Sequence, residues 1–195
     1  MTPPTPDAFG SKAALRQQMR QRLKMLPESS LHHWSGQIVH ALQKRSDLWA
    51  QPGTIALFGG LRSEPDLIST FLPWLQERGW RSVFFAVQGV ELVPMSVTSA
   101  QDLRRGPLGV WEPAGGQVVP HAELDLILVP GLAFGLRDGT RLGRGGGFYD
   151  RLLSRPELAR ARRIAVAFHL QLLPDIPCEP HDIRVPEIIT ELDGV

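Results

Sequence analysis

Apolar residues near the start of the chain recur every three to four positions, which is the spacing of a helix that buries one face. We expect a first helix over residues 11–26, with Ser11 as its N-cap, and a second from Ser29 or Ser30 to Leu42. The apolar stripe of the first helix consists of Leu15, Met19 and Leu23. The apolar spacing in both segments predicts helices that pack one face against a core.

Shorter apolar runs without helical spacing follow, and they predict strands. They cover residues 54–58, 81–87, 91–97, 124–129, 163–168 and 188–190. Between the first two runs, Ser63 as N-cap, Pro65 in the first turn and Asp66 at the capping-box position predict a helix start. That helix is expected to end at Arg78, and residues 103–113 are expected to be irregular.

Strands and helical stretches alternate with glycine at the joints, which predicts an α/β fold with a mostly parallel sheet. In such folds, ligands bind at the carboxyl ends of the strands. The loop 59–64, the loop 143–147 and the proline-rich loop around His181 all follow predicted strands. We therefore expect the three loops to converge on one edge of the sheet.

The composition narrows the class of protein. A chain of 195 residues is the size of one domain, which we place at residues 11–195 after a proline-rich tail, residues 1–10, expected to be disordered. A net charge of +1 argues against nucleic acid or an anionic membrane as partner. The single cysteine, Cys178, excludes an intrachain disulfide. No apolar run reaches the roughly 18 residues of a membrane span, and the N-terminus does not resemble a secretory signal, so we expect a cytoplasmic protein.

The segment Asp125–Arg151 carries the candidate chemistry. Its buried strand ends at Pro130-Gly131, and a turn at 137–139 leads to a glycine-rich run, 141–147, that opens a helix at Phe148. A glycine-rich turn before a helix suits an anion, because the backbone N–H groups can approach phosphate oxygens closely. Arginine side chains in the run add fork-shaped donors for phosphate or carboxylate. Phosphate binding is therefore the favoured interpretation.

A plain tight turn is the alternative, with Asp150 only complementing the helix dipole rather than holding magnesium. The run is not a P-loop, because no Gly-Lys-Ser/Thr ends it, and it lacks the dinucleotide pattern G-x-G-x-x-G. Two roles also stay open for Glu64. It could be an acidic residue that complements the dipole in the first turn of a helix, or a residue that binds a ligand. Trp111 could stack on an aromatic ligand or pack on the core.

Val129-Pro130-Gly131-Leu132-Ala133-Phe134 and the run from Arg141 to Arg151 closely resemble the signature of the 5-formyltetrahydrofolate cyclo-ligases, also called 5,10-methenyltetrahydrofolate synthetases. Matches extend from Lys12 to Thr190. Two departures stand out: Phe148 replaces the usual tyrosine, and Ala86-Val87 replaces the usual Leu-Pro.

The resemblance implies a three-layer α/β/α fold with a Rossmann-like sheet, and an enzyme that uses ATP and Mg²⁺. It assigns Lys12 and Arg16 to the ATP phosphates, Glu64 and Gly59 to the pterin pocket, and Asp150 with Asp182 to the magnesium ion. Further nucleotide contacts fall on Arg141, Leu142, Gly143, Arg144, Gly145, Gly146, Gly147, Phe148 and Tyr149. Further folate contacts fall on Arg144, Gly147 and Phe148.

The reaction implied by the resemblance is ATP-dependent closure of 5-formyltetrahydrofolate to 5,10-methenyltetrahydrofolate, with release of ADP and phosphate. Arg144, Tyr149 and Asp150 are the candidate catalytic residues, and the protein is expected to be a monomer with small-molecule partners. Two other classes stay open. One is a sugar-phosphate enzyme that needs no ATP, and the other is an RNA-associated binding module that uses the basic first helix.

Overall fold

The computed structural model describes residues 11–180 and 182–194, and it confirms the α/β fold class. The predicted tail, residues 1–10, lies outside this range. A six-stranded sheet has the order β11-β9-β6-β1-β2-β3, in which every neighbouring pair is parallel except β2 with β3. Its strands are β1 (Thr54–Ala56), β2 (Arg81–Gln88), β3 (Glu91–Ser96), β6 (Leu126–Val129), β9 (Arg162–Val166) and β11 (Ile188–Ile189). The mostly parallel sheet predicted from the alternation is therefore correct.

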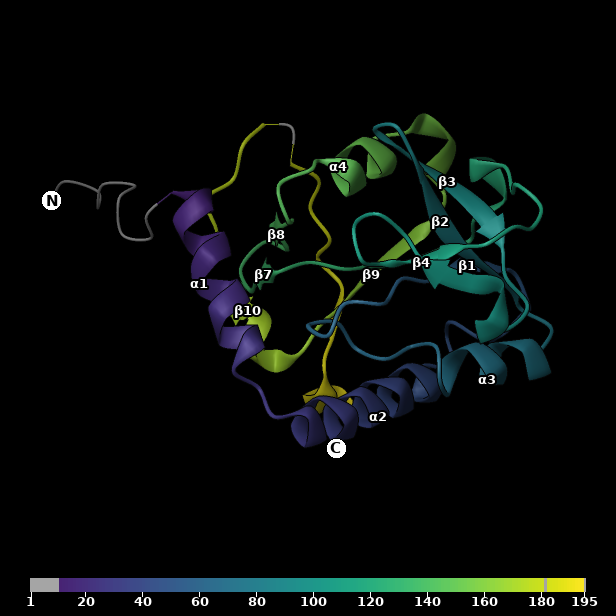
Figure 1. The fold of residues 1–195 in the computed structure, drawn as a ribbon, viewed down its shortest axis with the longest axis horizontal. Helices are drawn as coiled ribbons and strands as arrows, with labels where there is room; N and C mark the ends of the chain where they lie inside the picture. Colours follow the sequence, from purple (N-terminus) through teal and green to yellow (C-terminus); the bar gives the residue numbers. More distant parts are fainter. Residues whose placement is uncertain (1–10, 181, 195) are drawn as a thin grey trace, which may run out of the picture.

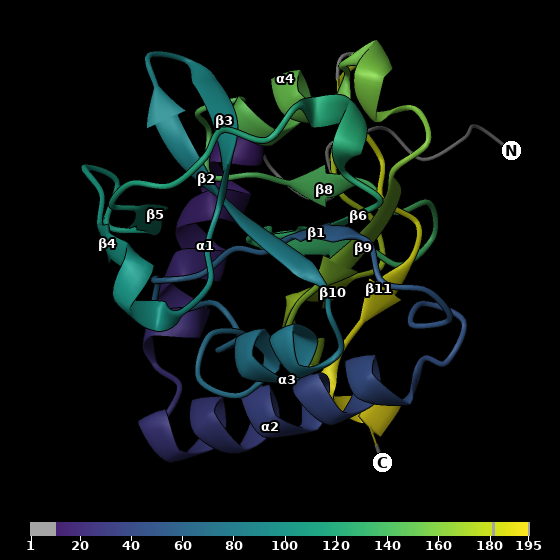
Figure 2. The same cartoon turned by 90° about the vertical axis from the view of Figure 1, so that its right-hand side faces the viewer.

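Helices cover both faces of this sheet, which gives three layers (Figure 2). Helices α2 (Glu28–Lys44) and α3 (Phe71–Glu77) lie on one face, and α4 (Phe148–Leu153) lies on the other. Helix α1 (Lys12–Lys24) stands beside a small second sheet, whose strands are β10 (Leu172–Leu173), β7 (Ala133–Gly135) and β8 (Arg141–Leu142) in that order (Figure 1). Short 3-10 helices are Ala100–Asp102, His121–Glu123, Pro156–Leu158, His169–Gln171 and Glu191–Gly194.

Helix α1 begins where the sequence predicts. The Ser11 hydroxyl accepts a hydrogen bond from the Ala14 N–H at 3.3 Å, which satisfies one of the unpaired donors of the first turn. The predicted stripe of Leu15, Met19 and Leu23 is buried in the core. Helix α1 is therefore anchored by its apolar face, and its basic residues are left for other contacts.

The predicted helix start at Ser63 is wrong, because α3 begins only at Phe71. The groups that would have capped a helix at this point make other contacts instead. The Ser63 hydroxyl binds Arg144, and the Asp66 N–H donates to the Ser35 hydroxyl on α2. The Asp66 carboxylate accepts from the N–H groups of the turn before α3. The residues around Ser63 form a turn, in which the Glu64 N–H donates to the Leu61 carbonyl at 3.0 Å, rather than the start of a helix.

Residues 103–113 are also more regular than predicted. They form an antiparallel hairpin of β4 (Leu103–Arg105) and β5 (Trp111–Pro113). The Trp111 N–H donates to the Gly59 carbonyl at 2.9 Å, so the hairpin is fastened to the loop after β1. A second hairpin surrounds the turn at 137–139 and consists of β7 (Ala133–Gly135) and β8 (Arg141–Leu142); β7 also pairs with β10 (Leu172–Leu173).

Four charged side chains join the chain after α2 to the start of β9 and the residue before β11. Arg45 and Arg162 each bind both Asp47 and Glu187, with N–O distances of 2.7–2.8 Å. Burial opposes ionisation of Glu187, but the hydrogen bonds from Arg162 and Arg45 outweigh it and lower the pKa of this carboxyl. The two arginines therefore stabilise the ionised form of Glu187.

We expect Glu187→Gln to lower the free energy of unfolding by about 1 kcal/mol at pH 7, because two arginines lose a shared partner. A carboxyl with a lowered pKa stabilises the fold above its unfolded pKa of about 4.3 and loses that effect as the pH falls. The difference from wild type should therefore shrink towards pH 3. Glu123→Gln, which breaks only the single Arg81–Glu123 pair, is the control. Urea unfolding at both pH values measures the effect, and an equal loss in both variants would contradict it.

Candidate functional site

The glycine loop, defined here as residues 143–147, connects β8 to α4. Gly145 has φ +109° and Gly147 has φ +67°, backbone conformations that residues with a Cβ rarely adopt. At Gly146 a Cβ would lie 2.8 Å from the Phe148 ring. Gly147 is the N-cap of α4, so the loop ends at a helix N-terminus. These positions leave the backbone uncovered, as close approach of a ligand requires.

Basic residues of α1 contact this loop from outside. The Arg16 Nε donates to the Gly143 carbonyl and the Arg20 Nη2 to the Arg144 carbonyl, each at 2.9 Å. Lys12, one helical turn before Arg16, donates to Asp182 at 2.5 Å. Two cations of α1 therefore hold the loop, and Lys12 on the same helix binds Asp182. Arg20 is a loop contact that the sequence analysis did not single out.

A buried ion pair supports the loop from the other side. The Arg141 Nη2 lies 2.8 Å from the Asp150 Oδ1, and the Arg141 side chain is only 4% exposed. Its guanidinium also lies 5.6 Å from the centre of the Tyr149 ring. The pair joins the end of β8 to the first turn of α4, so the two ends of the loop are held at a set distance.

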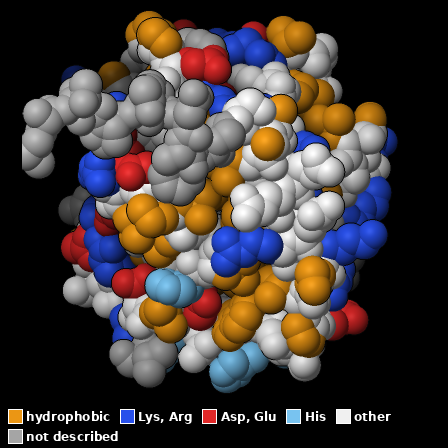
Figure 3. Space-filling view, turned by 90° about the vertical axis from the view of Figure 1, so that its left-hand side faces the viewer, with side chains coloured by type: hydrophobic (Ala, Val, Ile, Leu, Met, Phe, Trp, Pro, Cys, Tyr) orange, Lys and Arg blue, Asp and Glu red, His pale blue; other side chains and the backbone are white. Residues whose placement is uncertain are grey.

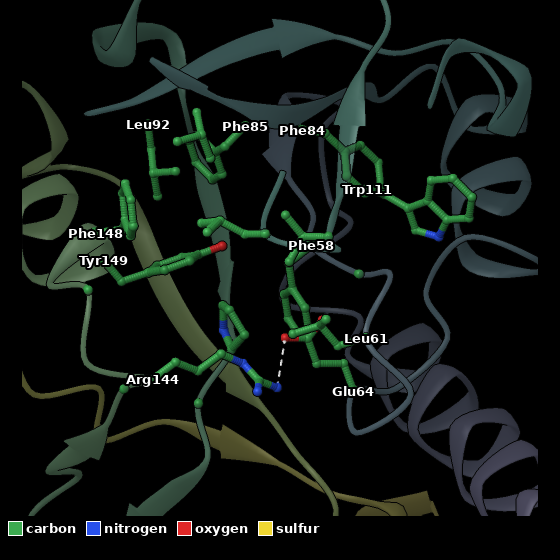
Figure 4. Close-up of a pocket in the computed structure, with 18 of the residues that line it drawn as sticks. Phe58, Leu61, Glu64, Phe84, Phe85, Leu92, Trp111, Arg144, Phe148 and Tyr149 are labelled. Carbon is green, nitrogen blue, oxygen red and sulfur yellow. Dashed lines mark ion pairs between the residues drawn. The ribbon is translucent and has the colours of Figure 1, made fainter. Parts of the chain in front are cut away.

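A cavity of about 320 Å³ lies beside the glycine loop (Figure 4). Residues 57–59, which follow β1, form one wall together with side chains of β2; the β4–β5 hairpin forms another wall and α4 a third. The residues that line it are mostly apolar or aromatic: Leu57, Phe58, Gly59, Leu61, Glu64, Phe84, Phe85, Val87, Leu92, Leu108, Val110, Trp111, Pro130, Gly131, Arg141, Gly143, Arg144, Gly146, Phe148 and Tyr149. Such walls suit a flat aromatic ligand.

Glu64 is the one carboxylate in the lining. Its side chain is 6% exposed, and its Oε1 lies 3.5 Å from the Arg144 Nη2, which reaches across from the glycine loop (Figure 4). Its Oε2 has no hydrogen-bond partner within the part of the chain that the structure describes. Burial raises the pKa of Glu64, and Arg144 opposes the shift. A buried acceptor without a partner is expensive in an unliganded protein, so it indicates a place for a ligand donor.

The Tyr149 hydroxyl points into the same cavity (Figure 4). Burial, and then the charge of Glu64, raise the pKa of the Tyr149 phenol above its ordinary value. Tyr149 therefore keeps its proton at neutral pH and is suited to donate a hydrogen bond.

Trp111 separates this cavity from a more open hollow of about 660 Å³ on the side of α2. Gly59, Leu61 and Glu64 line both spaces. The Arg105 guanidinium covers the Trp111 ring at 4.3 Å from its centre. Trp111 packs against the core, as one of the two predicted roles has it, and it also lines the cavity; stacking on a ligand stays a prediction.

The cavity collects some of the predicted site residues and leaves others at its edge. Gly59, Glu64, Arg141, Gly143, Arg144, Gly146, Phe148 and Tyr149 line it. The Leu142 side chain is buried in the core, so only its backbone is available to a nucleotide. The other predicted residues lie outside the lining: Gly145 and Gly147 in the loop, Asp150 in α4, Arg16 against the loop, and Lys12 paired with Asp182. The sequence could not indicate the apolar walls, because Phe84 and Phe85 have the pattern of ordinary core residues.

The residues present fit a nucleotide phosphate and a magnesium ion. Among the described residues no group of three or more His, Cys, Asp or Glu could hold a metal. Magnesium binds through one or two carboxylates together with substrate phosphates, and it prefers oxygen ligands. Asp150 and Asp182 supply that donor type, each beside a cation: Asp150 beside Arg141, and Asp182 beside Lys12.

On the face of the molecule that carries α1, the Lys and Arg side chains of the described residues do not gather in a single basic patch (Figure 3). Lys and Arg side chains occur there among acidic and apolar ones. This mixture suits small anionic ligands better than a long polyanion. Within residues 11–180 and 182–194, no helix is long and apolar enough to cross a membrane.

Comparison with known proteins agrees with this geometry. A family model described as the 5-formyltetrahydrofolate cyclo-ligase family matches residues 8–191. A Mycolicibacterium smegmatis protein named 5-formyltetrahydrofolate cyclo-ligase is 33% identical over 198 residues, covering 95% of this chain and 96% of the relative. A Mus musculus protein of the same name is 38% identical over 105 residues, covering 49% of this chain and 51% of the relative.

Two solved structures share the fold. The Aquifex aeolicus 5,10-methenyltetrahydrofolate synthetase superposes with a TM-score of 0.78 at 29% identity, covering 92% of this chain and 89% of its own. A 5,10-methenyltetrahydrofolate synthetase from Mycoplasma pneumoniae gives a TM-score of 0.77 at 24% identity, covering 93% and 99%.

Proposed function

Since the chain belongs to the 5-formyltetrahydrofolate cyclo-ligase family, we propose that it converts 5-formyltetrahydrofolate to 5,10-methenyltetrahydrofolate, with ATP hydrolysed to ADP and phosphate. The observation that supports this most is the buried Glu64, whose Oε2 lacks a partner among the described residues, at the base of an aromatic cavity beside a cationic glycine loop. Family membership sets aside the two other classes that the sequence left open.

The folate would occupy the aromatic cavity. A pterin carries adjacent N–H donors on a flat ring, and a carboxylate can accept a pair of hydrogen bonds from such donors. Glu64 offers this carboxylate, and apolar side chains such as Phe58 and Phe85 offer surfaces for the ring. Gly59, Gly147 and Phe148 complete the proposed folate contacts. The N–H donors would compensate for the burial of Glu64.

The nucleotide would lie against the glycine loop. Lys12, Arg16, Arg141 and Arg144 supply positive charge, and the loop from Leu142 to Tyr149 supplies backbone donors. Asp150 and Asp182 would hold the magnesium ion, which when bound neutralises phosphate charge.

The chemistry requires positioning rather than a protein nucleophile. The formyl group on N5 is an amide whose oxygen is a poor leaving group. Transfer of the γ-phosphoryl group to that oxygen, with departure of ADP, turns it into a good leaving group. N10 then attacks the formyl carbon, the carbon–oxygen bond breaks to release phosphate, and N10 loses its proton. Arg144 lies between the two ligand sites and would stabilise the charge that moves from ADP to the formyl oxygen.

The proposal is tested by absorbance of 5,10-methenyltetrahydrofolate formed from 5-formyltetrahydrofolate. We expect product only when ATP and Mg²⁺ are both present, because the phosphates need the metal for charge neutralisation. Release of one phosphate per product provides the check on stoichiometry. Product without ATP would contradict the mechanism, and no product under any condition would contradict the function.

A further inference from the structure

Ser63 contacts Arg144 more closely than Glu64 does. We propose that Ser63 is a positioning residue for the reaction, whose hydroxyl holds the Arg144 guanidinium between the folate cavity and the glycine loop. This inference rests on the proposed function, because it concerns the placement of an arginine within that site. The Arg144 Nη2 donates to the Ser63 Oγ at 2.8 Å, whereas its distance to the Glu64 Oε1 is 3.5 Å. Only the first is within the normal hydrogen-bond range.

Arg144 needs such a partner because little else holds its side chain. It lies between Gly143 and Gly145, in a loop whose glycines allow several backbone conformations, and its side chain is 37% exposed. An arginine side chain loses much rotamer freedom when it is held in one position. A single well-formed hydrogen bond to a guanidinium offsets much of that. Ser63 supplies it from the opposite side of the site, on the loop after β1.

The neutral hydroxyl of Ser63 can hold Arg144 both before and after folate binds, whereas the carboxylate of Glu64 cannot. Glu64 is the proposed partner of the pterin, so its oxygens are engaged once the folate binds. Ser63 carries no charge and remains an acceptor for Arg144 in both the free and the folate-bound protein. Arg144 can therefore stay at the edge of the cavity, close to the formyl oxygen that accepts the phosphoryl group. The hydroxyl is available because no helix begins at Ser63.

The test is the kinetics of Ser63→Ala in the methenyltetrahydrofolate assay. We expect kcat to fall about 10-fold, as loss of a hydrogen bond to a charged group predicts. KM for 5-formyltetrahydrofolate should change less than about 3-fold and the melting temperature should be unchanged. Ser63→Thr, which keeps the hydroxyl, should restore kcat to within about 2-fold. Ser69→Ala is the matched control, because it removes a bonded hydroxyl from the same loop without touching Arg144.

A double-mutant cycle shows whether Ser63 acts through Arg144. Rates are measured under single-turnover conditions with enzyme in excess, where slow chemistry can still be followed. In the Arg144→Ala background, Ser63→Ala should cause no further loss beyond about 2-fold. A full 10-fold loss in that background, an unaltered kcat in Ser63→Ala, or no recovery in Ser63→Thr would each overturn the inference. An inactive wild-type protein would instead overturn the proposed function.

Discussion

Asp150→Asn is expected to lower kcat by about 10²–10³-fold, the range seen when one preorganised electrostatic contact is removed from an active site. The asparagine lacks the negative charge that the proposed magnesium ion requires. Asparagine is a better replacement than alanine, because its carbonyl can still accept a hydrogen bond from Arg141, whose side chain is 4% exposed. The measurement is the initial rate as a function of Mg²⁺ concentration at saturating ATP.

Asp182→Asn provides the comparison for Asp150→Asn. Both variants should need more Mg²⁺ for half-maximal rate, because each loses a proposed ligand. Asp150→Asn should also lower the free energy of unfolding by about 1–3 kcal/mol, since it weakens a buried ion pair. If Asp150→Asn turned over at the wild-type rate with the same Mg²⁺ dependence, Asp150 would have no place in the site.

Glu64→Gln is expected to raise KM for 5-formyltetrahydrofolate about 100-fold while making the free protein more stable. The loss of affinity follows from replacing a charged acceptor of two hydrogen bonds by an amide that also carries donors. The gain in stability, about 1 kcal/mol, follows from removing a carboxylate whose burial opposes its charge. The lost pair with Arg144 subtracts little, because that guanidinium is 37% exposed.

The stability difference should depend on pH in a defined direction. Burial raises the pKa of Glu64, so the folded state binds more protons than the unfolded state and stability falls as the pH rises above about 4.3. Glutamine does not titrate, so the gain in the free energy of unfolding of Glu64→Gln over wild type should be largest at neutral pH and absent in acid. Denaturant unfolding at pH 4 and pH 7 measures this.

Glu112→Gln is the matched control for Glu64→Gln. Glu112 is also buried, and one of its oxygens lacks a partner among the described residues, but it lies outside the cavity lining and accepts from the Val87 N–H. Its KM should stay within about 3-fold of wild type. A 100-fold rise in KM in both Glu64→Gln and Glu112→Gln would show that Glu64 acts on folate binding only indirectly.

Features that depend on local spacing were predictable from the sequence. Ser11 caps α1, the apolar run 126–129 is a fully buried strand, and Gly147 opens α4. Each follows from contacts between residues close in the chain. The same kind of rule predicts a helix start at Ser63, and this is wrong: α3 begins at Phe71, and the Ser63 hydroxyl accepts from Arg144, 81 positions away.

The sequence by itself determined the fold class and the glycine loop, since the period of apolar residues and the need for positive φ are properties of short segments. Only the tertiary structure decided how the site is enclosed. Phe84 and Phe85 follow a strand pattern whether they face a core or a cavity, and Glu64 and Arg144 meet only when distant loops come together. Burial and long-range pairing depend on the packing of the whole chain, and these two quantities distinguish a ligand site from an ordinary turn.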